Sequence, residues 1–295
     1  MGFKSDPLKL VKSFKVQNDK GQWENVKNEL TTDDLYIYLQ HRRLKNPNIS
    51  SHVMVDLMGE NPYMTPGKAL IQAFGLLEYS AIDPYYTHRG GVIEVLAEAY
   101  LREVLYPSYE LVIENYELAD FPGYNQFPNE KPFSGVLDKA IVQPFRLPLE
   151  IKSKEMKDYS WIVGKGKYPE AEVTQGQHLA DLWKASQVMM LWGFIDTKLQ
   201  TYLKGVTEAE IFETFTKMHY GERRIDYDKA VQELGLTYKD VTWEFKIYDV
   251  DHAKLKKYRD FSVQIYDQVI NERRIPRKWF NHSELEDIDK FIKGL

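Results

Sequence analysis

Two short apolar segments, residues 134–142 and 147–153, carry charged side chains inside what the sequence predicts to be a β-hairpin. Asp138 lies in the first segment, and Glu150 and Lys152 lie in the second. Because successive side chains of a strand point to opposite faces, Glu150 and Lys152 project from the same face. An unpaired charge on a covered face is strongly unfavourable. Three ionisable groups in one small patch of sheet therefore indicate a chemical role.

The loop between the two segments decides whether the two acids can meet. A five-residue loop at 142–146 places Asp138 opposite Glu150, whereas a four-residue loop would send them to opposite faces unless a bulge intervened. Two carboxylates on one face can hold Mg²⁺ or Mn²⁺ and leave positions open for water and phosphate. Such a metal lowers the pKa of its bound water, and an adjacent lysine can stabilise the attacking hydroxide. The pattern favours metal-assisted phosphodiester hydrolysis, although a Glu-x-Lys pair alone is also typical of an edge-strand surface.

The remaining segments predict helices and strands in mixed order. Apolar spacing, capping residues and breaks predict helices over 35–39, 65–77, 87–105, 174–194 and 251–272, and further strands over 110–116 and 241–248. The short helix at 35–39 is expected because Thr31, Thr32, Asp33 and Asp34 resemble an N-cap. This order predicts an α/β (α+β) fold with a central mixed β-sheet flanked by helices.

Composition excludes several classes of site. The chain has 295 residues and no cysteine, which excludes a disulfide scaffold, a zinc ribbon, an iron–sulfur cluster bound by thiolates and a cysteine nucleophile. The net charge of −5 permits a local basic groove but not a generally basic surface. The N-terminus does not resemble a secretory signal, and no stretch approaches the ~20 apolar residues that span a membrane. We therefore expect a cytoplasmic protein without a membrane partner.

Four motifs in order resemble the core of the PD-(D/E)XK nucleases, particularly the RecB-type and lambda-exonuclease-like viral recombination branch. Asp138 and the run Glu150-Ile151-Lys152 carry the central part of the likeness. Upstream, HRGGVIE at 88–94 resembles the family's Gly-x-x-x-Glu motif, and downstream QVMMLWG at 187–193 resembles its helix with Gln before an aromatic residue. The resemblance implies a restriction-endonuclease-like core with N- and C-terminal helical extensions.

The resemblance also implies a role for each matching residue. Asp138 and Glu150 would be catalytic metal ligands, Ile151 would add its carbonyl, and Lys152 would be the catalytic lysine. Glu94 would bind the metal directly or through water, although an acid in the first turns of a helix can also simply complement the helix dipole. Gln187 would position the lysine or the substrate, but Gln175 and Gln177 begin the same expected helix and either could serve instead.

Two basic clusters are candidates for nucleic-acid binding. The first follows the hairpin and interleaves lysines with aromatic residues, a combination suited to meeting phosphates and stacked bases; it comprises Lys154, Lys157, Lys165 and Lys167, with Tyr159, Trp161 and Tyr168. The second, near the C-terminus, contains Arg273 and Arg274. A solvated loop and a helix end are the structural alternatives for these two clusters.

These inferences together predict three regions and one activity. We expect a mostly helical extension of unknown role at 1–80, a nuclease core at 81–250, and a helical segment at 251–295 packed on that core. The expected activity is that of a Mg²⁺- or Mn²⁺-dependent DNA nuclease, an exonuclease of recombination or DNA processing by preference. The resemblance implies as partners DNA, a single-strand annealing or recombination protein and further copies of the chain. The alternatives are an endonuclease of a defence or packaging system and a non-catalytic binding or assembly protein that keeps the fold.

Overall fold

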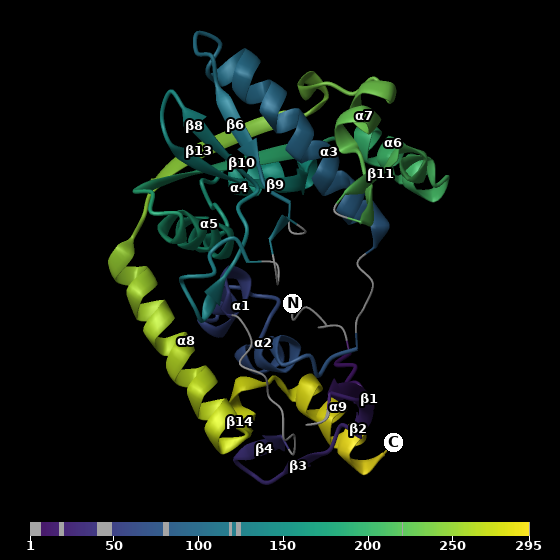
Figure 1. Ribbon diagram of the computed structural model, residues 1–295, viewed down its shortest axis with the longest axis vertical. Coiled ribbons are helices and arrows are strands. Elements are labelled where there is room, and N and C mark those ends of the chain that lie inside the picture. Colours follow the sequence, from purple (N-terminus) through teal and green to yellow (C-terminus); the bar gives the residue numbers. More distant parts are fainter. Residues whose placement is uncertain are drawn as a thin grey trace. The chain divides into compact units, whose positions relative to one another are not determined.

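The chain forms two compact units (Figure 1). The central unit comprises Ala81–Pro128 and Gly135–Asp251, and the terminal unit comprises Met1–Ser80, Asn129–Ser134 and His252–Leu295. The computed structural model describes residues 7–17, 21–39, 49–78, 83–117, 120–121, 125–219 and 221–294.

A five-stranded mixed sheet forms the middle of the central unit, in the order β13–β10–β9–β8–β6. Its strands are β6 (Val112–Asn115), β8 (Lys139–Gln143), β9 (Leu147–Glu155), β10 (Gln187–Ile195) and β13 (Thr242–Asp249). The pair β9–β10 is parallel, and the other three neighbouring pairs are antiparallel. The expected hairpin and the two further strands expected at 110–116 and 241–248 are thus confirmed.

Helices cover both faces of this sheet. The helix α3 (Pro84–Tyr100), which continues into the π-helix η1 (Leu101–Leu105), packs on one face, where Ile93 lies against Gly193 of β10. The helix α5 (Glu170–Leu182) packs on the other face, where Gly176 lies against Glu150 of β9 and Met190 of β10. The expected α/β fold, with a central mixed sheet between helices, is confirmed.

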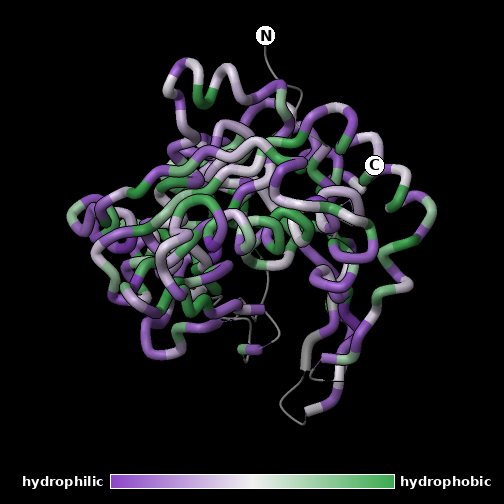
Figure 2. Tube along the Cα trace, turned by 90° about the horizontal axis from the view of Figure 1, so that it is seen from above, coloured by the Kyte–Doolittle hydropathy of each residue, from purple (hydrophilic) through white to green (hydrophobic). Residues whose placement is uncertain are grey.

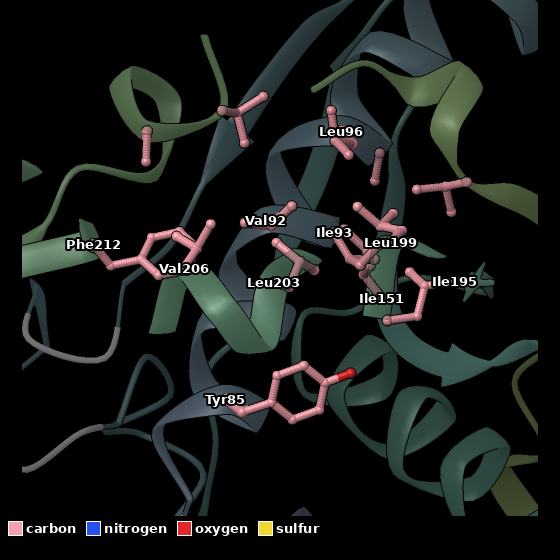
Figure 3. Packing of buried hydrophobic residues seen from close by; sticks show 14 of the residues in the cluster. Tyr85, Val92, Ile93, Leu96, Ile151, Ile195, Leu199, Leu203, Val206 and Phe212 are labelled. Carbon is pink, nitrogen blue, oxygen red and sulfur yellow. The ribbon is translucent and has the colours of Figure 1, made fainter. Parts of the chain in front are cut away.

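The largest core of the central unit lies on the α3 face. Residues of α3, of α6 (Thr197–Glu208) and of the sheet interdigitate there, and Figure 3 shows Ile93 of α3 and Leu199 of α6 close to Ile151 of β9. Burying side chains of this kind stabilises the fold by about 1.5–3 kcal/mol each before conformational entropy is counted. This core fixes α3, and therefore Glu94, above β9.

Short elements complete the central unit around these layers. They are η4 (Met156–Asp158), α4 (Tyr159–Ile162), η5 (Ile211–Phe215), β11 (Thr216–His219), β12 (Glu222–Ile225), α7 (Tyr227–Glu233) and η6 (Tyr238–Asp240). The α7 helix packs against α3, where the ring of Tyr227 lies over Gly91.

The long helix expected over 174–194 is wrong in its second half. The helix α5 ends at Leu182, Lys184 adopts a left-handed φ of 60°, and β10 begins at Gln187. Every residue of β10 after Gln187 is buried, because sheet strands lie on both sides of it and helices cover both faces. A strand buried on both faces has a continuous apolar run, which periodicity alone does not distinguish from a buried helix.

The terminal unit joins the two ends of the chain. Its described elements are β1 (Ser13–Gln17), β2 (Trp23–Lys27), β3 (Leu30–Thr32), β4 (Tyr36–Leu39), β5 (Ile49–Ser50), α1 (Ser51–Leu57), α2 (Pro66–Ala73), β7 (Phe133–Ser134), α8 (His252–Glu272), β14 (Arg274–Pro276), η7 (Arg277–Trp279) and α9 (His282–Lys293). The strand β14 pairs with β4, and the Leu8 N–H donates to Asp287 Oδ2 at 2.8 Å.

This arrangement differs from two expectations about the extensions. The N-terminal segment was expected to be mostly helical, but its described residues hold five strands and two helices. The predicted helix at 35–39 is the strand β4, because Asp33 accepts the N–H groups of Leu35 and Tyr36 and so closes a turn. The segment 251–295 was expected to pack on the nuclease core, whereas the contacts of His252–Leu295 group these residues with residues 1–80.

In the part of the chain that the structure describes, every helix is too short or too polar to cross a membrane. Figure 2 shows hydrophilic residues interrupting the hydrophobic ones along the trace.

Candidate active site

Asp138 and Glu150 meet across the hairpin β8–β9. Lys139 pairs with Leu149 and Ile141 with Leu147, so the loop has the five residues expected and the same register places Asp138 opposite Glu150. The Ile151 N–H donates to Asp138 Oδ2 at 2.7 Å. This bond holds the Asp138 carboxylate beside the backbone that connects Glu150 to Lys152.

Glu150 and Lys152 form an ion pair on the α5 face of β9. Lys152 Nζ lies 2.5 Å from Glu150 Oε1. The Glu150 side chain is only 2% exposed, whereas Lys152 is 24% exposed. Within the described part of the chain, nothing hydrogen-bonds the buried second oxygen of Glu150, Oε2. One carboxylate oxygen therefore remains available in a site that solvent reaches from the lysine side.

Glu94 completes the group of acids from the opposite layer. It lies in the third turn of α3, which begins at Pro84 and has no acid in its first turn, so complementing the helix dipole does not explain it. Burial and the neighbouring Asp138 raise the pKa of Glu94 to about 8. Burial and Asp138 likewise raise the pKa of Glu150 to about 7. The carboxylates of this cluster repel one another, and a cation between them would relieve that repulsion.

The same charges act on Asp138 and Lys152. Burial raises the pKa of Asp138 and outweighs the opposing effect of Lys152. Burial alone would lower the pKa of Lys152, but Glu150 and Asp138 more than offset it, and the pKa of the ammonium lies above its usual value. Lys152 is therefore charged at any pH at which the protein is expected to work.

The donor set suits a hard divalent cation, although no metal centre is formed as the side chains stand. Among the described residues, no three His, Asp or Glu side chains are gathered closely enough to hold an ion. Glu94, Asp138 and Glu150 nevertheless supply only carboxylate oxygens, which Mg²⁺ and Mn²⁺ prefer. The partnerless Glu150 Oε2 and the raised carboxyl pKa values fit such an ion. Ile151 contributes its N–H, and a role for its carbonyl stays a prediction.

The structure does not bring Gln187 to this site. Gln187 is exposed at the first position of β10, where its Nε2 donates to Asp249 Oδ1 at 2.9 Å. Trp192 pairs with Lys152, so Gln187 starts five residues, roughly 16 Å, further along the strand. The expectation that Gln187 positions the lysine is therefore wrong in its geometry.

The helix α5 offers a better placed amide. Gly176 faces Glu150, and Gln177 Nε2 donates to the Asp249 carbonyl at 2.7 Å, on the β13 side of the helix. Residues 175 and 177 are about 200° apart around a helix. Gln175 therefore lies on the flank of α5 away from Gln177 and β13. This residue was one of the two alternatives that the sequence left open.

The first basic cluster begins within β9, at Lys154, and continues in the segment that follows the strand. Lys154 pairs with Glu172 of α5, and Lys157 Nζ lies 2.6 Å from Glu155 Oε2. Lys165 and Lys167 are exposed, and Lys167 Nζ lies 5.9 Å from the centre of the Trp161 ring. The expected interleaving of cations and aromatic rings is present in space as well as in sequence.

Two residues near the site were not anticipated from the sequence. Glu172 contacts Lys154 and accepts the Trp192 indole N–H at 2.9 Å. Arg89 donates through Nε to Ser153 Oγ at 3.0 Å, and its guanidinium lies 5.0 Å from the centre of the exposed Tyr86 ring. An acid one turn into a helix and an arginine in HRGG carry no distinctive sequence signal, so only the packing of α3 and α5 identifies them.

The second basic cluster belongs to the terminal unit. Arg274 has two neighbours there: its Nη2 lies 2.6 Å from Glu272 Oε2, and its guanidinium lies 4.0 Å from the centre of the Tyr36 ring. Arg273 ends α8 with a left-handed φ of 53°. A nucleic-acid-binding role for this pair stays a prediction.

Comparison with known proteins adds one distant likeness. No protein-family model matches the chain, and no curated protein matches it. Among solved structures, the chain is similar to an alkaline exonuclease from Laribacter hongkongensis, with 12% sequence identity, a TM-score of 0.45, and coverage of 84% of this chain and 93% of that one. So weak a likeness decides neither the fold nor the function, and both rest on the residues described above.

Proposed function

We propose that the chain is a divalent-metal-dependent DNA nuclease, an exonuclease by preference, that acts in recombination or DNA processing. One observation carries the proposal: Asp138, Glu150 and Lys152 meet at one point of the hairpin, with Asp138 bound to the backbone between the other two. A merely structural Glu–Lys pair would not explain two further acids whose carboxyl pKa values are raised beside it. Perturbed carboxyls in a cluster of this kind are characteristic of functional sites.

Glu94, Asp138 and Glu150 would hold Mg²⁺ or Mn²⁺. When bound, the ion lowers the pKa of water and neutralises charge that develops on the phosphate. The Ile151 N–H fixes the direction of one ligand, Asp138, and burial between β9 and α5 fixes another, Glu150. Ligands held in this way are preorganised, which favours binding in a defined geometry.

Lys152 supplies the positive charge that the reaction needs beside the acids. Its raised pKa keeps it protonated, so it acts by donating hydrogen bonds to a phosphate oxygen or to the attacking water and not as a base. Gln175, which helix geometry places on the flank of α5 away from β13, would orient Lys152 or the substrate. The partly exposed side of the site, at Lys152, is where the scissile phosphate would enter.

The substrate strand would continue from Lys152 toward the first basic cluster. Lys154 and Lys157 follow Lys152 on the same segment of chain, and the exposed ring of Trp161 lies beyond them beside Lys167. Lysines that meet phosphates and rings that stack on bases are the features of a single-strand path. From this path we infer that the substrate is a DNA end with an unpaired strand.

Incubation of the purified chain with linear duplex, single-stranded and circular DNA, with Mg²⁺ or with EDTA, tests the proposal. We expect linear DNA to be degraded from its ends only when Mg²⁺ is present, and circular DNA to persist. Cleavage of circular DNA would instead favour an endonuclease of a defence or packaging system. If Mg²⁺ or Mn²⁺ produces no degradation of any substrate, the chain is a non-catalytic binding or assembly protein and the proposal fails.

A further inference from the structure

The strand β13 presents an unusual outer edge. It is the end strand of the five-stranded sheet, and no strand in the described part of the chain pairs with its outer side. Two large apolar residues on it are open to solvent, Phe245 at 39% and Ile247 at 44%. An exposed apolar edge strand is a template for pairing with another chain, and soluble proteins usually blunt or cover such edges.

The pattern along β13 has two different faces. Trp243, Phe245 and Ile247 alternate with Glu244 and Lys246, so the apolar side chains share one face and the charged ones share the other. The apolar face is the one that carries Leu191 and Ile151 in neighbouring strands, because Phe245 pairs with Leu191. A strand added beside β13 would therefore extend the apolar surface that α3 partly covers.

Among the registers centred on Glu244, Phe245 or Lys246, one sets opposite charges of two β13 copies face to face. Only every second residue of an edge strand points its N–H and C=O groups outward. Two copies related by a twofold axis can therefore pair only if the axis passes beside a residue, which then faces its own copy. Centring on Glu244 sets two acids face to face, and centring on Lys246 sets two lysines face to face. Centring on Phe245 instead sets Glu244 against Lys246 of the other copy twice, and Trp243 against Ile247 twice. Opposite charges on facing strands are stabilising and like charges are destabilising.

We propose that two copies of the chain associate through their β13 strands, antiparallel about a twofold axis at Phe245, so that the two sheets become one continuous sheet. The complementarity of Glu244 with Lys246 and the exposed apolar residues of the same strand carry this inference. A twofold interface of this kind uses the same patch on both copies and closes on itself. It concerns an edge of the sheet remote in sequence from Asp138, Glu150 and Lys152, and it holds or fails independently of nuclease activity.

Light scattering after size exclusion, over a range of protein concentrations, measures the association. We expect a concentration-dependent dimer in the wild type. Lys246→Glu places acids against Glu244 and should weaken the dimer roughly tenfold or more. The double variant Glu244→Lys with Lys246→Glu restores opposite charges in the same register and should recover dimerisation. A monomer at every concentration, or a dimer indifferent to Lys246→Glu, overturns the proposal.

The absence of cysteine in the chain allows a direct test of the register. In a symmetric pair centred on Phe245, the two Cα atoms at position 245 lie about 4.5–5.5 Å apart, within reach of a disulfide. Phe245→Cys should therefore give a covalent dimer under mild oxidation. Ile247→Cys is the matched control, since its two copies lie on opposite sides of the axis and should not link. Efficient linking at position 247 without linking at 245 contradicts the proposed register.

Discussion

At the scale of single residues, the ion pair of Glu150 and Lys152 makes the sharpest prediction. Lys152→Ala should lower the rate of DNA cleavage by roughly a thousandfold, because it removes the charged donor beside the scissile phosphate. The fold should remain, since Lys152 is partly exposed and its loss leaves no large cavity. Lys198→Ala, which removes an exposed lysine of α6 outside both basic clusters, is the control. Wild-type cleavage by the Lys152 variant, with both proteins equally folded by circular dichroism, would exclude the proposed role of the lysine.

Variants of two glutamines test whether Gln175, as the structure favours, or Gln187, as the sequence favoured, orients Lys152 or the substrate. Gln175→Ala should reduce kcat about tenfold with little change in KM, because we propose that Gln175 orients Lys152 or the substrate from α5. Gln187→Ala should leave both constants near those of the wild type, since Gln187 bonds Asp249 at the far end of β10. Steady-state kinetics on a linear duplex distinguishes the two. A large loss with Gln187→Ala and none with Gln175→Ala would contradict the placement derived from the helix α5.

The positions of site residues were predictable where the residues lie close together in the sequence. Asp138 directly precedes β8, and Glu150 and Lys152 lie on β9. Five residues separate the last paired residues of β8 and β9, so the meeting of the three side chains follows from alternation and loop length. Gln175 could be named only as an alternative to Gln187, because its position depends on how α5 packs across three strands. Glu172 and Arg89 depend on the same packing of helices on the sheet and were not predictable from residue type.

At the scale of elements, burial on both faces explains the largest error. The strand β10 lies between β9 and β13 and beneath two helix layers, so its residues after Gln187 are uniformly apolar. Neither a period of two nor a period of 3.6 survives in such a run. The helices α3 and α8 were predicted close to their observed bounds, since the buried residues of each recur at helical spacing.

Two adjacent glycines of α3 test how this helix is held over β9. A Cβ on Gly91 would lie 2.4 Å from the ring of Tyr227 in α7, whereas a Cβ on Gly90 would meet nothing within 4 Å. Gly91→Ala should therefore destabilise the protein by about 1–3 kcal/mol through overpacking. Gly90→Ala should stabilise it by about 0.5–1 kcal/mol through a better helix propensity.

Urea denaturation of both variants measures these changes in the free energy of unfolding. Gly91→Ala should also lower nuclease activity beyond its effect on stability, because Glu94 lies one turn further along α3. Equal stability of the Gly90 and Gly91 variants would show that α7 does not press on α3 at this point.

At the scale of the whole molecule, the joining of the chain ends was beyond local reasoning. The strand β14 pairs with β4, and Glu284 accepts the Thr65 hydroxyl hydrogen bond at 2.8 Å across 219 residues. Contacts of such long range leave no periodic trace in either segment. The sequence correctly predicted helices near the C-terminus but did not indicate that they group with the N-terminal segment.

The cluster of acids gives the whole molecule a pH dependence with a definite sign. The pKa of Glu94 is raised to about 8 and that of Glu150 to about 7, both above the ordinary value of 4.5. Between pH 4.5 and pH 8 the folded state therefore binds more protons than the unfolded state. The stability of the metal-free protein therefore falls as the pH rises from about 4.5 to about 8. A bound divalent cation favours the ionised carboxylates, so the stabilisation that it brings grows over the same range.

Thermal unfolding at pH 6 and pH 8.5, with EDTA or with about 5–10 mM Mg²⁺, measures both effects. This Mg²⁺ concentration is a large excess over an ordinary Kd. We expect the Tm in EDTA to fall on the order of 5 °C between the two pH values and Mg²⁺ to restore most of it. Glu94→Gln removes one of the two titrating acids, so it should flatten the fall in EDTA and weaken the response to Mg²⁺ together. A metal-free Tm that rises toward pH 8.5 by the same amount in wild type and variant would mean that Glu94 does not titrate in this range and that the acids are not a cation site.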